Sequence, residues 1–330
     1  MRNSREFIGA FAPEFQMFLD EKHACGLKYV EGERLLRKLD EICVAQNRNN
    51  GLSKELSLTF IRPRPNWSQG TYAHHANVLS QIARFLNIHG VQAYMPDTKL
   101  KLGVERSFSP YIFSKGEIKR IFSVADNLFS SRSLIRSHDF YPVILRLLYS
   151  SGLRISEALH LTMKDVDLDE GTVFIKNSKN HRDRLLPLNP QMRPYLIRYA
   201  EKYHAVYRSD DYFFSPPNGG HYDKGTVYHK FRDILFKCGI SHGGRENGGP
   251  RLHCLRHTFC VHSLRQFIAD GVDHCTALPL LSVYMGHTSI AATGQYLKLT
   301  AEAYPEISEL MENEFGSLIP VWEAPDDEAD

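Results

Sequence analysis

Six polar residues in five short motifs could together perform chemistry on a phosphodiester. They are Arg154 in GLRISEAL, Lys179 in NSKNHRDRLLPL, His253 and Arg256 in HCLRHTF, His287 in MGHTSI and Tyr296 in GQYLKL. Two guanidinium groups can hold the non-bridging oxygens, because each is a planar fork of N–H donors that stays charged. A tyrosine can attack the phosphorus, while a lysine and a histidine transfer the protons. The set predicts metal-free cleavage and rejoining of DNA through a phosphotyrosine.

Two of these motifs place polar residues three positions apart. Arg154 follows Gly-Leu at the expected start of a helix, and Glu157 can share its helix face and orient the guanidinium. His253 and Arg256 leave one face of another helix in the same way. Each pair alone is weak evidence, because a surface Arg–Glu pair or a structural histidine would look the same.

Lys179 lies in the polar turn of an expected β-hairpin, where a lysine can reach over a substrate and donate a proton to a leaving oxygen. The same turn is where any protein would place solvated lysines. Lys176, Arg182 and Arg184 are neighbours that could be confused with it. Alignment on the RLLPL strand favours Lys179 over Lys176.

Tyr296 follows His287 by nine residues. A phenol is a poor nucleophile at its ordinary pKa of ~10, so adjacent arginines and a general base would have to favour its oxyanion form. The chain has 16 tyrosines, and most tyrosines are packing residues. Tyr284 and Tyr304 are nearby alternatives for the nucleophile.

The ordered set of motifs resembles the tyrosine recombinase (phage integrase) family. GLRISEAL, KNHRDRLLPL, HCLRHTF and MGHTSI followed by a tyrosine stand in the order and at the approximate spacing of that family. The likeness is detailed over residues 110–300 and looser over 1–95, where the family carries a helical core-binding domain. Two departures, a Gly-rich insertion before His253 and Leu252 where many members have proline, remove no reacting group.

The resemblance implies a role for each catalytic residue. Tyr296 would attack the scissile phosphate and leave a 3′-phosphotyrosyl bond and a free 5′-hydroxyl. Arg154 and Arg256 would stabilise the negative charge of the transition state. Because these arginines replace a metal and the covalent link conserves bond energy, no metal, ATP or other cofactor is expected.

The same resemblance assigns the proton transfers and the assembly. Lys179 would protonate the departing 5′ oxygen, His253 would take the tyrosine proton, and His287 would hydrogen-bond the phosphate. The partners would be double-stranded DNA with specific recombination sites, gripped by two domains in a C shape. Recombination would proceed within a homotetramer on two such sites, with accessory DNA-bending or co-recombinase proteins as further partners.

The composition is that of a globular protein with no membrane span. The 330 residues suffice for two domains. No apolar run approaches the ~20 residues that cross a bilayer, and the N-terminus lacks a signal-peptide core. The six cysteines form no CxxC pair, so we expect reduced thiols, no metal site, and a cytoplasmic, nucleoid-associated protein.

The distribution of charge separates the body of the chain from its end. Over residues 106–300, Lys and Arg outnumber Asp and Glu by nine. Residues 301–330 hold ten acidic residues and no Lys or Arg. The body suits a polyanionic partner and the tail does not. The apolar residues of the tail recur near helical spacing and suit a groove on a partner protein. The resemblance implies docking on a neighbouring protomer, with packing on its own domain as the alternative.

The apolar pattern predicts a mainly α fold with a small β-hairpin or sheet, an α+β architecture. A core-binding domain over 1–100 should hold one helix over 15–46, with a possible interruption at Gly26, and another over 72–90. A linker over 101–110 leads to a catalytic domain over 111–300. That domain should contain a helix capped by Ser114 and Glu117, a buried helix near 140–150, strands near 171–176 and 183–188, and helices over 190–205, 223–237, 253–269, 275–285 and 289–298.

Basic residues of the N-terminal domain are candidates for contacts with DNA phosphates. They are Lys22, Lys28, Arg34, Arg37, Lys38, Arg62, Arg64 and Arg84. For any one of them a solvated helix face is the alternative, because long cationic side chains also cover apolar surface.

The leading interpretation is a site-specific recombinase that integrates, excises or transposes a mobile element. Alternatives are a recombinase that resolves chromosome or plasmid dimers, a type IB topoisomerase, which shares much of the chemistry, and a non-catalytic DNA-binding regulator on the same scaffold. The intact set of six residues argues against the regulator.

Overall fold

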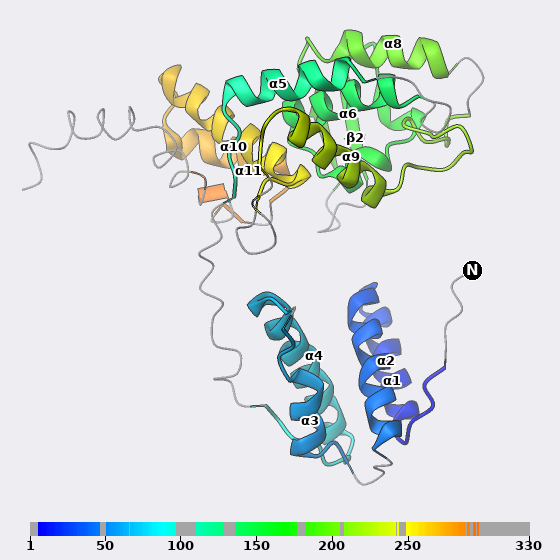
Figure 1. Ribbon diagram of the computed structural model, residues 1–330. Coiled ribbons are helices and arrows are strands. Elements are labelled where there is room, and N and C mark those ends of the chain that lie inside the picture. Colours follow the sequence, from blue (N-terminus) through cyan, green and yellow to red (C-terminus); the bar gives the residue numbers. More distant parts are fainter. Residues whose placement is uncertain are drawn as a thin grey trace, which may run out of the picture. The chain divides into compact units, whose positions relative to one another are not determined.

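A computed structural model describes residues 6–46, 51–65, 67–96, 110–128, 136–176, 183–204, 208–241, 243, 249–287, 289–290, 293–294 and 296. These residues belong to two compact units, one within residues 1–107 and the other within 108–330 (Figure 1). Lys179 and the tail over 301–330 lie outside the described residues. None of the described helices is both long and apolar enough to cross a membrane.

The first unit is helical, with α1 (Ala12–Ala24), α2 (Val30–Ala45), α3 (Lys54–Ile61) and α4 (Gln69–Ile88). The single helix expected over 15–46 is two helices. The break falls at Gly26, whose φ of +76° is a left-handed conformation that glycine adopts without steric cost. The expectation for 72–90 is confirmed by α4. The short α3, capped by the Ser53 hydroxyl on the Leu56 N–H, was not predicted.

One hydrophobic core holds this unit together. Large apolar side chains from all four helices are excluded from solvent, among them Phe15, Phe18, Leu35, Leu39, Phe60, Leu79 and Leu86. The rings of Phe18 and Phe85 meet edge to face at 5.3 Å, joining α1 to α4. Such burial is the main source of stability for a domain of this size.

The second unit is also mostly helical, and its first helices match the expectation from sequence. In α5 (Lys115–Asp126) the Ser114 side chain and the Glu117 carboxylate form the predicted capping box. The helix α6 (Ser137–Ser151) is almost wholly buried. It packs against α5, α8 (Arg193–Tyr203) and α10 (Leu252–Ala269), so it is the centre of the unit (Figure 1).

A three-stranded antiparallel sheet lies beside these helices. Its order is β1 (Val166–Asp167), β2 (Thr172–Ile175) and β3 (Arg184–Pro187), with Ile175 opposite Arg184. The two predicted strands are confirmed as β2 and β3, and the two-residue β1 is additional. Lys179 belongs to the residues between β2 and β3 that the structure does not describe.

Shorter elements complete the unit and place the candidate residues. They are α7 (Ile155–Leu159), the 3-10 helix η2 (Met163–Asp165), α9 (Lys224–Lys237) and α11 (His274–Met285). The helices expected over 190–205, 223–237, 253–269 and 275–285 are therefore confirmed as α8, α9, α10 and α11. Of the segment expected as a helix over 289–298, Thr293, Gly294 and Tyr296 are helical among the residues described. The predicted mainly α fold with a small sheet is confirmed.

Candidate active site

Gly152 ends α6 and determines where the chain leads into Arg154, two residues later. Its φ is +60°, and a Cβ at this position would lie 2.5 Å from a ring carbon of Phe259 and 2.7 Å from the Met285 sulfur. Glycine is therefore required, both for its backbone conformation and for the close packing of α6 on α10 and α11. The chain then turns through Leu153 into Arg154, the residue that precedes α7.

Arg154 is fixed by Glu157, as the spacing of the two residues predicts. The Arg154 backbone N–H donates to one carboxylate oxygen at 2.9 Å, and Nη1 donates to the other at 2.7 Å. The Glu157 side chain is only 6% exposed. Burial alone would raise the pKa of Glu157, but hydrogen bonds from Arg184 and then Arg154, with the charge of Arg184, outweigh it and lower that pKa. Glu157 is therefore an anion shared by two guanidinium groups.

Arg184 belongs to this cluster, although in the sequence it was only a neighbour that could be confused with Lys179. Its Nη2 and Nη1 donate to the two Glu157 oxygens at 3.0 and 3.3 Å, and its Nε donates to the Tyr284 carbonyl at 3.2 Å. The sequence RLLPL could have indicated this position for Arg184. Alternate residues of a strand share a face, and Leu186, two residues after Arg184, is buried. Arg184 must then point inward with it.

Arg256 is the most deeply buried cation of the site. Its side chain comes from α10, is 2% exposed, and donates to the Gly152 carbonyl at 2.5 Å and the Met285 carbonyl at 2.7 Å. Burial, followed by the charge of Arg154, lowers its pKa to about 10, so it remains protonated at neutral pH. Both acceptors are neutral, so the positive charge is available to an anion.

Tyr296 lies against a group of imidazole rings. His257 Nδ1 is 2.8 Å from the Tyr296 hydroxyl, and the ring of His287 is parallel to the phenol within 9°, with centroids 6.2 Å apart. His287 Nδ1 is in turn 2.7 Å from the Thr293 hydroxyl. The edge of His253 meets His257 at a centroid distance of 4.6 Å. The family resemblance implied that His253 accepts the tyrosine proton. In the structure it is His257 that lies within hydrogen-bond distance of the tyrosine hydroxyl.

Burial keeps these rings neutral. It is the largest cause that lowers the pKa of His257 to about 3 and of His287 to about 4, and positive neighbours add to it. His253 is more exposed than His257 and His287, and its pKa is also lowered, first by desolvation and then by Arg256 and Arg154. Burial likewise raises the pKa of Tyr296, which is 2% exposed. The charges of Arg256 and Arg154 favour the phenolate but do not outweigh that burial.

The structure thus gathers five of the six predicted catalytic residues. Arg154 and Arg256 act electrostatically on His253, His287 and Tyr296. The position of Lys179 is not described. Within the described part of the chain, no three His, Cys, Asp or Glu side chains are grouped to hold a metal ion.

A cavity of about 730 Å³ opens beside this cluster. The starts of α7, α9 and α10 line it, and its basic side chains are Arg154, Lys224 and Arg251, with His253 on the same wall. A concave basic surface of this kind suits a nucleic acid backbone.

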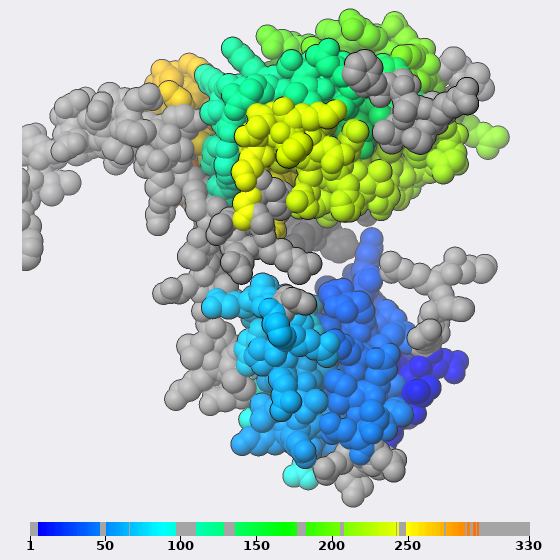
Figure 2. Space-filling model, viewed as in Figure 1, coloured from blue at the N-terminus to red at the C-terminus, as the bar shows by residue number. Residues whose placement is uncertain are grey.

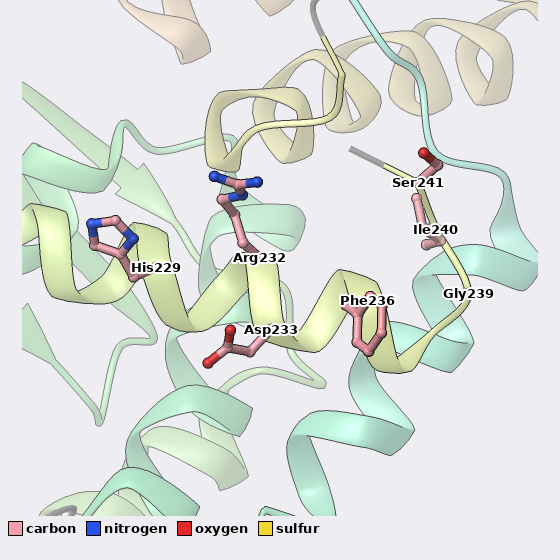
Figure 3. Close-up of a pocket in the computed structure, with 7 residues that line it drawn as sticks. All are labelled: His229, Arg232, Asp233, Phe236, Gly239, Ile240 and Ser241. Atoms are coloured by element: carbon pink, nitrogen blue, oxygen red, sulfur yellow. The ribbon is translucent and has the colours of Figure 1, made fainter. Parts of the chain in front are cut away.

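A second cavity, of about 570 Å³, lies at the far end of α9, a helix at the surface of the unit (Figure 2). It is lined by α9 side chains and the turn that follows, including Arg232, Asp233 and the exposed Phe236 (Figure 3). None of the six predicted catalytic residues is among its lining residues.

The basic residues predicted for DNA contact in the first unit have different surroundings. Arg34 pairs with Glu31 at 2.5 Å and Arg37 with Glu33 at 2.6 Å. Lys38 and Arg64 both lie within 6 Å of the Trp67 ring centre, at 5.9 and 5.7 Å.

Of the remaining four, Lys22 and Arg84 line a cavity of about 280 Å³ between α1 and α4. Arg62 lines another at the end of α3, and Lys28 is exposed before α2. Lys22 and Arg84 therefore share one cavity and Arg62 lines another, whereas Arg34 and Arg64 both act electrostatically on Lys38.

Comparison with known proteins gives the class. Residues 112–303 match the phage integrase family. The integrase/recombinase y4rB of Sinorhizobium fredii is 28% identical over 312 residues, which cover 92% of this chain and 98% of that protein. The tyrosine recombinase XerC of Staphylococcus saprophyticus is 28% identical over 196 residues, 59% of each chain.

Solved structures share the fold. The XerH site-specific recombinase bound to palindromic difH substrate has a TM-score of 0.62 at 19% identity, covering 86% of this chain and 79% of that one. The Tn1549 transposon integrase in complex with transposon right end DNA has a TM-score of 0.60 at 17% identity, covering 91% and 98%. Fold and family define a tyrosine-type site-specific recombinase. The chain belongs to the phage integrase family.

Proposed function

We propose that this recombinase cleaves and rejoins duplex DNA through a covalent bond between Tyr296 and a 3′ phosphate. The bond from Tyr296 Oη to phosphorus forms as the bond to the 5′ oxygen breaks. The phenol proton passes to a base of the protein, and the 5′ oxygen receives a proton from Lys179. Attack by a 5′-hydroxyl reverses the step. The observation that carries the proposal is the gathering of Arg154, Arg256 and three histidines around one buried tyrosine.

The guanidinium groups supply the charge stabilisation. Arg256 is held by two carbonyl oxygens and Arg154 by Glu157, so neither must reorganise when negative charge develops on the phosphate. Preorganised donors of this kind are often the largest single contribution to catalysis. His253, on the cavity wall beside Arg154, and His287 are suited to hydrogen-bond the same phosphate.

Several observations support double-stranded DNA as the partner. The XerH and Tn1549 proteins with this fold were solved with DNA, and the cavity beside Arg154 is basic. In this proposal residues 111–300 form the catalytic domain and residues 1–100 a core-binding domain joined by a linker over 101–110. Lys38 and Arg64, which share the Trp67 ring, are its strongest candidates for phosphate contact.

Mobile-element recombination is the biological role that we propose, and the likeness to the integrase/recombinase y4rB supports it. The likeness to y4rB spans nearly the whole of both chains, whereas the likeness to XerC spans 59% of each. Resolution of chromosome or plasmid dimers is the second candidate, favoured by the Xer likenesses. A tetramer on two DNA sites, assisted by accessory proteins and the tail over 301–330, completes the proposal. Inverted repeats or element ends in the DNA flanking the gene would distinguish the two roles.

The test is to recover DNA covalently attached to the chain. Cells carrying the gene with its flanking DNA on a plasmid would express the wild-type chain, Tyr296→Phe or Tyr284→Phe. The chain would be purified after denaturation in SDS, and its attached DNA sequenced. Tyr284 is the matched control, because its hydroxyl donates to the Pro187 carbonyl at 3.1 Å.

We expect attached DNA for the wild-type chain and Tyr284→Phe, and none for Tyr296→Phe. A gel shift on duplexes made from the recovered sequences should show that Tyr296→Phe still binds. Adducts formed by Tyr296→Phe would exclude Tyr296 as the nucleophile and overturn the proposal.

A further inference from the structure

His257 is the histidine that meets the Tyr296 hydroxyl. Its Nδ1 is 2.8 Å from Tyr296 Oη, and the two rings are 5.6 Å apart with their planes inclined by 43°. Tyr296 is 2% exposed, so bulk water has little access to the hydroxyl. A proton that leaves the phenol must therefore pass to a neighbouring group of the protein, and a general base must be within hydrogen-bond reach.

We propose that His257 is the base that accepts the Tyr296 proton during cleavage, an inference that rests on the reaction proposed above. The phenol O–H bond breaks as an N–H bond forms at His257 Nδ1 and the oxygen bonds to phosphorus. The electron pair of the broken P–O bond leaves with the 5′ oxygen, which is protonated by Lys179. On rejoining, His257 returns its proton to the tyrosine. Nδ1 can accept because the neutral ring carries its proton on the other nitrogen in one tautomer.

The surroundings of His257 make this transfer depend on the substrate. Arg256 and His253 on the same helix, and His287 after α11, all oppose a positive charge on the ring. With no phosphate in place the proton therefore stays on the buried phenol. A phosphodiester held by Arg154 and Arg256 brings a compensating negative charge, which raises the basicity of His257. The nucleophile is thus activated when the scissile phosphate is bound.

The position of His253 fits a different role. Its ring lies on the cavity wall with Arg154 and meets His257 through a ring contact at 4.6 Å. It can therefore reach a phosphate in the cavity while His257, one helical turn further on, reaches the tyrosine. Two histidines four positions apart on one helix face divide the two tasks.

Two substitutions separate a base from a residue that only positions the tyrosine. In His257→Asn the amide oxygen can still accept a hydrogen bond near the place of Nδ1, but it cannot take up a proton. In His257→Phe both properties are lost. On the duplexes recovered with the wild-type chain, we expect both variants to form covalent adduct at least ~100-fold more slowly in single turnovers, the lower end of general-base effects. Gel-shift affinity and thermal unfolding serve as controls for binding and folding.

The decisive measurement replaces Tyr296 with a tyrosine analogue whose phenol has a lower pKa. A 2,3,5-trifluorotyrosine at position 296 loses its proton more readily and needs less help from a base. It should restore most of the adduct rate in His257→Asn but little in Arg256→Lys, whose defect lies in holding the phosphate. Absence of rescue in a folded, DNA-binding His257→Asn chain, or a near-normal rate in either His257→Asn or His257→Phe, would overturn the proposal. Either result would leave Tyr296 as the nucleophile, so failure here is distinct from failure of the proposed cleavage reaction.

Discussion

The two halves of the active site keep their groups in opposite states of charge. Arg154, Arg184 and Glu157 stay charged because they pair with one another, and Arg256 stays charged against two carbonyl oxygens. The second half consists of His253, His257, His287 and Tyr296, in which burial favours neutral rings. In the proposed reaction, the groups that stabilise negative charge are therefore preorganised. The proton of Tyr296 stays on the phenol until the phosphate is bound. Substitutions that affect one half without the other can test this division.

The largest effect is expected in the guanidinium half, from Arg256→Ala. Loss of one preorganised donor to a developing oxyanion costs about 10²–10³ in rate, and two buried carbonyl oxygens lose their partner as well. We expect single-turnover adduct formation to fall by at least that factor and the unfolding midpoint in urea to fall. Arg198→Ala, an exposed arginine on α8, is the matched control. A near-normal rate in Arg256→Ala would remove it from the phosphate site.

A smaller effect is expected from Glu157→Gln, which removes the charge shared by Arg154 and Arg184 while keeping the size of the side chain. The amide keeps one acceptor oxygen, but it replaces the other oxygen with an NH2 group that faces N–H donors of Arg154 and Arg184. We expect a loss of about 2–3 kcal/mol in the free energy of unfolding and roughly a tenfold slower cleavage through misplacement of Arg154. Glu201→Gln on the exposed face of α8 is the control. Unchanged stability would show that the cluster does not need the anion.

The histidine half predicts how stability depends on pH. His257 and His287 have pKa values of about 3 and 4 when folded, against ~6.5 when unfolded. Between these values the unfolded chain binds more protons, so stability rises with pH and is lost as pH falls from 6.5 towards 4. We expect each ring to contribute on the order of 2.5 kcal/mol, so the free energy of unfolding should be on the order of 5 kcal/mol lower at pH 4.5 than at pH 7.

Urea titrations at several pH values measure how the free energy of unfolding changes with pH. His257→Asn should flatten this dependence, because one of the two rings no longer titrates. Arg198→Gln, on the exposed face of α8, should leave it unchanged. An identical pH dependence in the wild-type chain and His257→Asn would mean that folding does not lower the pKa of His257.

The smallest effect is expected from removal of divalent ions. In the proposed reaction Arg154, Arg256 and Lys179 supply the positive charge and the proton that a metal ion would otherwise provide. Excess EDTA should therefore change the rate of adduct formation by less than about twofold. DNA binding must be measured in parallel, because ions also act on the phosphate backbone. A chemical step that stops in EDTA and resumes with added Mg²⁺ would contradict the division of tasks in the site.

Local sequence determined the elements and most of the site. The Ser114 and Glu117 capping box, the strands β2 and β3 and the Arg154–Glu157 pair each depend on residues close together in the chain, and each follows from the sequence pattern. The order and spacing of the five motifs are enough to indicate the family. The break at Gly26 was foreseen as a possibility, whereas α3 was missed because eight residues ahead of a Pro-rich segment give little periodic signal.

Tertiary structure decided which side chains meet. Arg184 lies 27 residues from Glu157, and His257 lies 39 residues from Tyr296. The motif HCLRHTF contains two histidines, and spacing along the helix could not say which one reaches the tyrosine. That choice depends on how α10 packs against α6 and α11, where Gly152 allows the close approach that seats Arg256. Helix faces follow from local periodicity, but the partner of each face depends on the packing of the whole core.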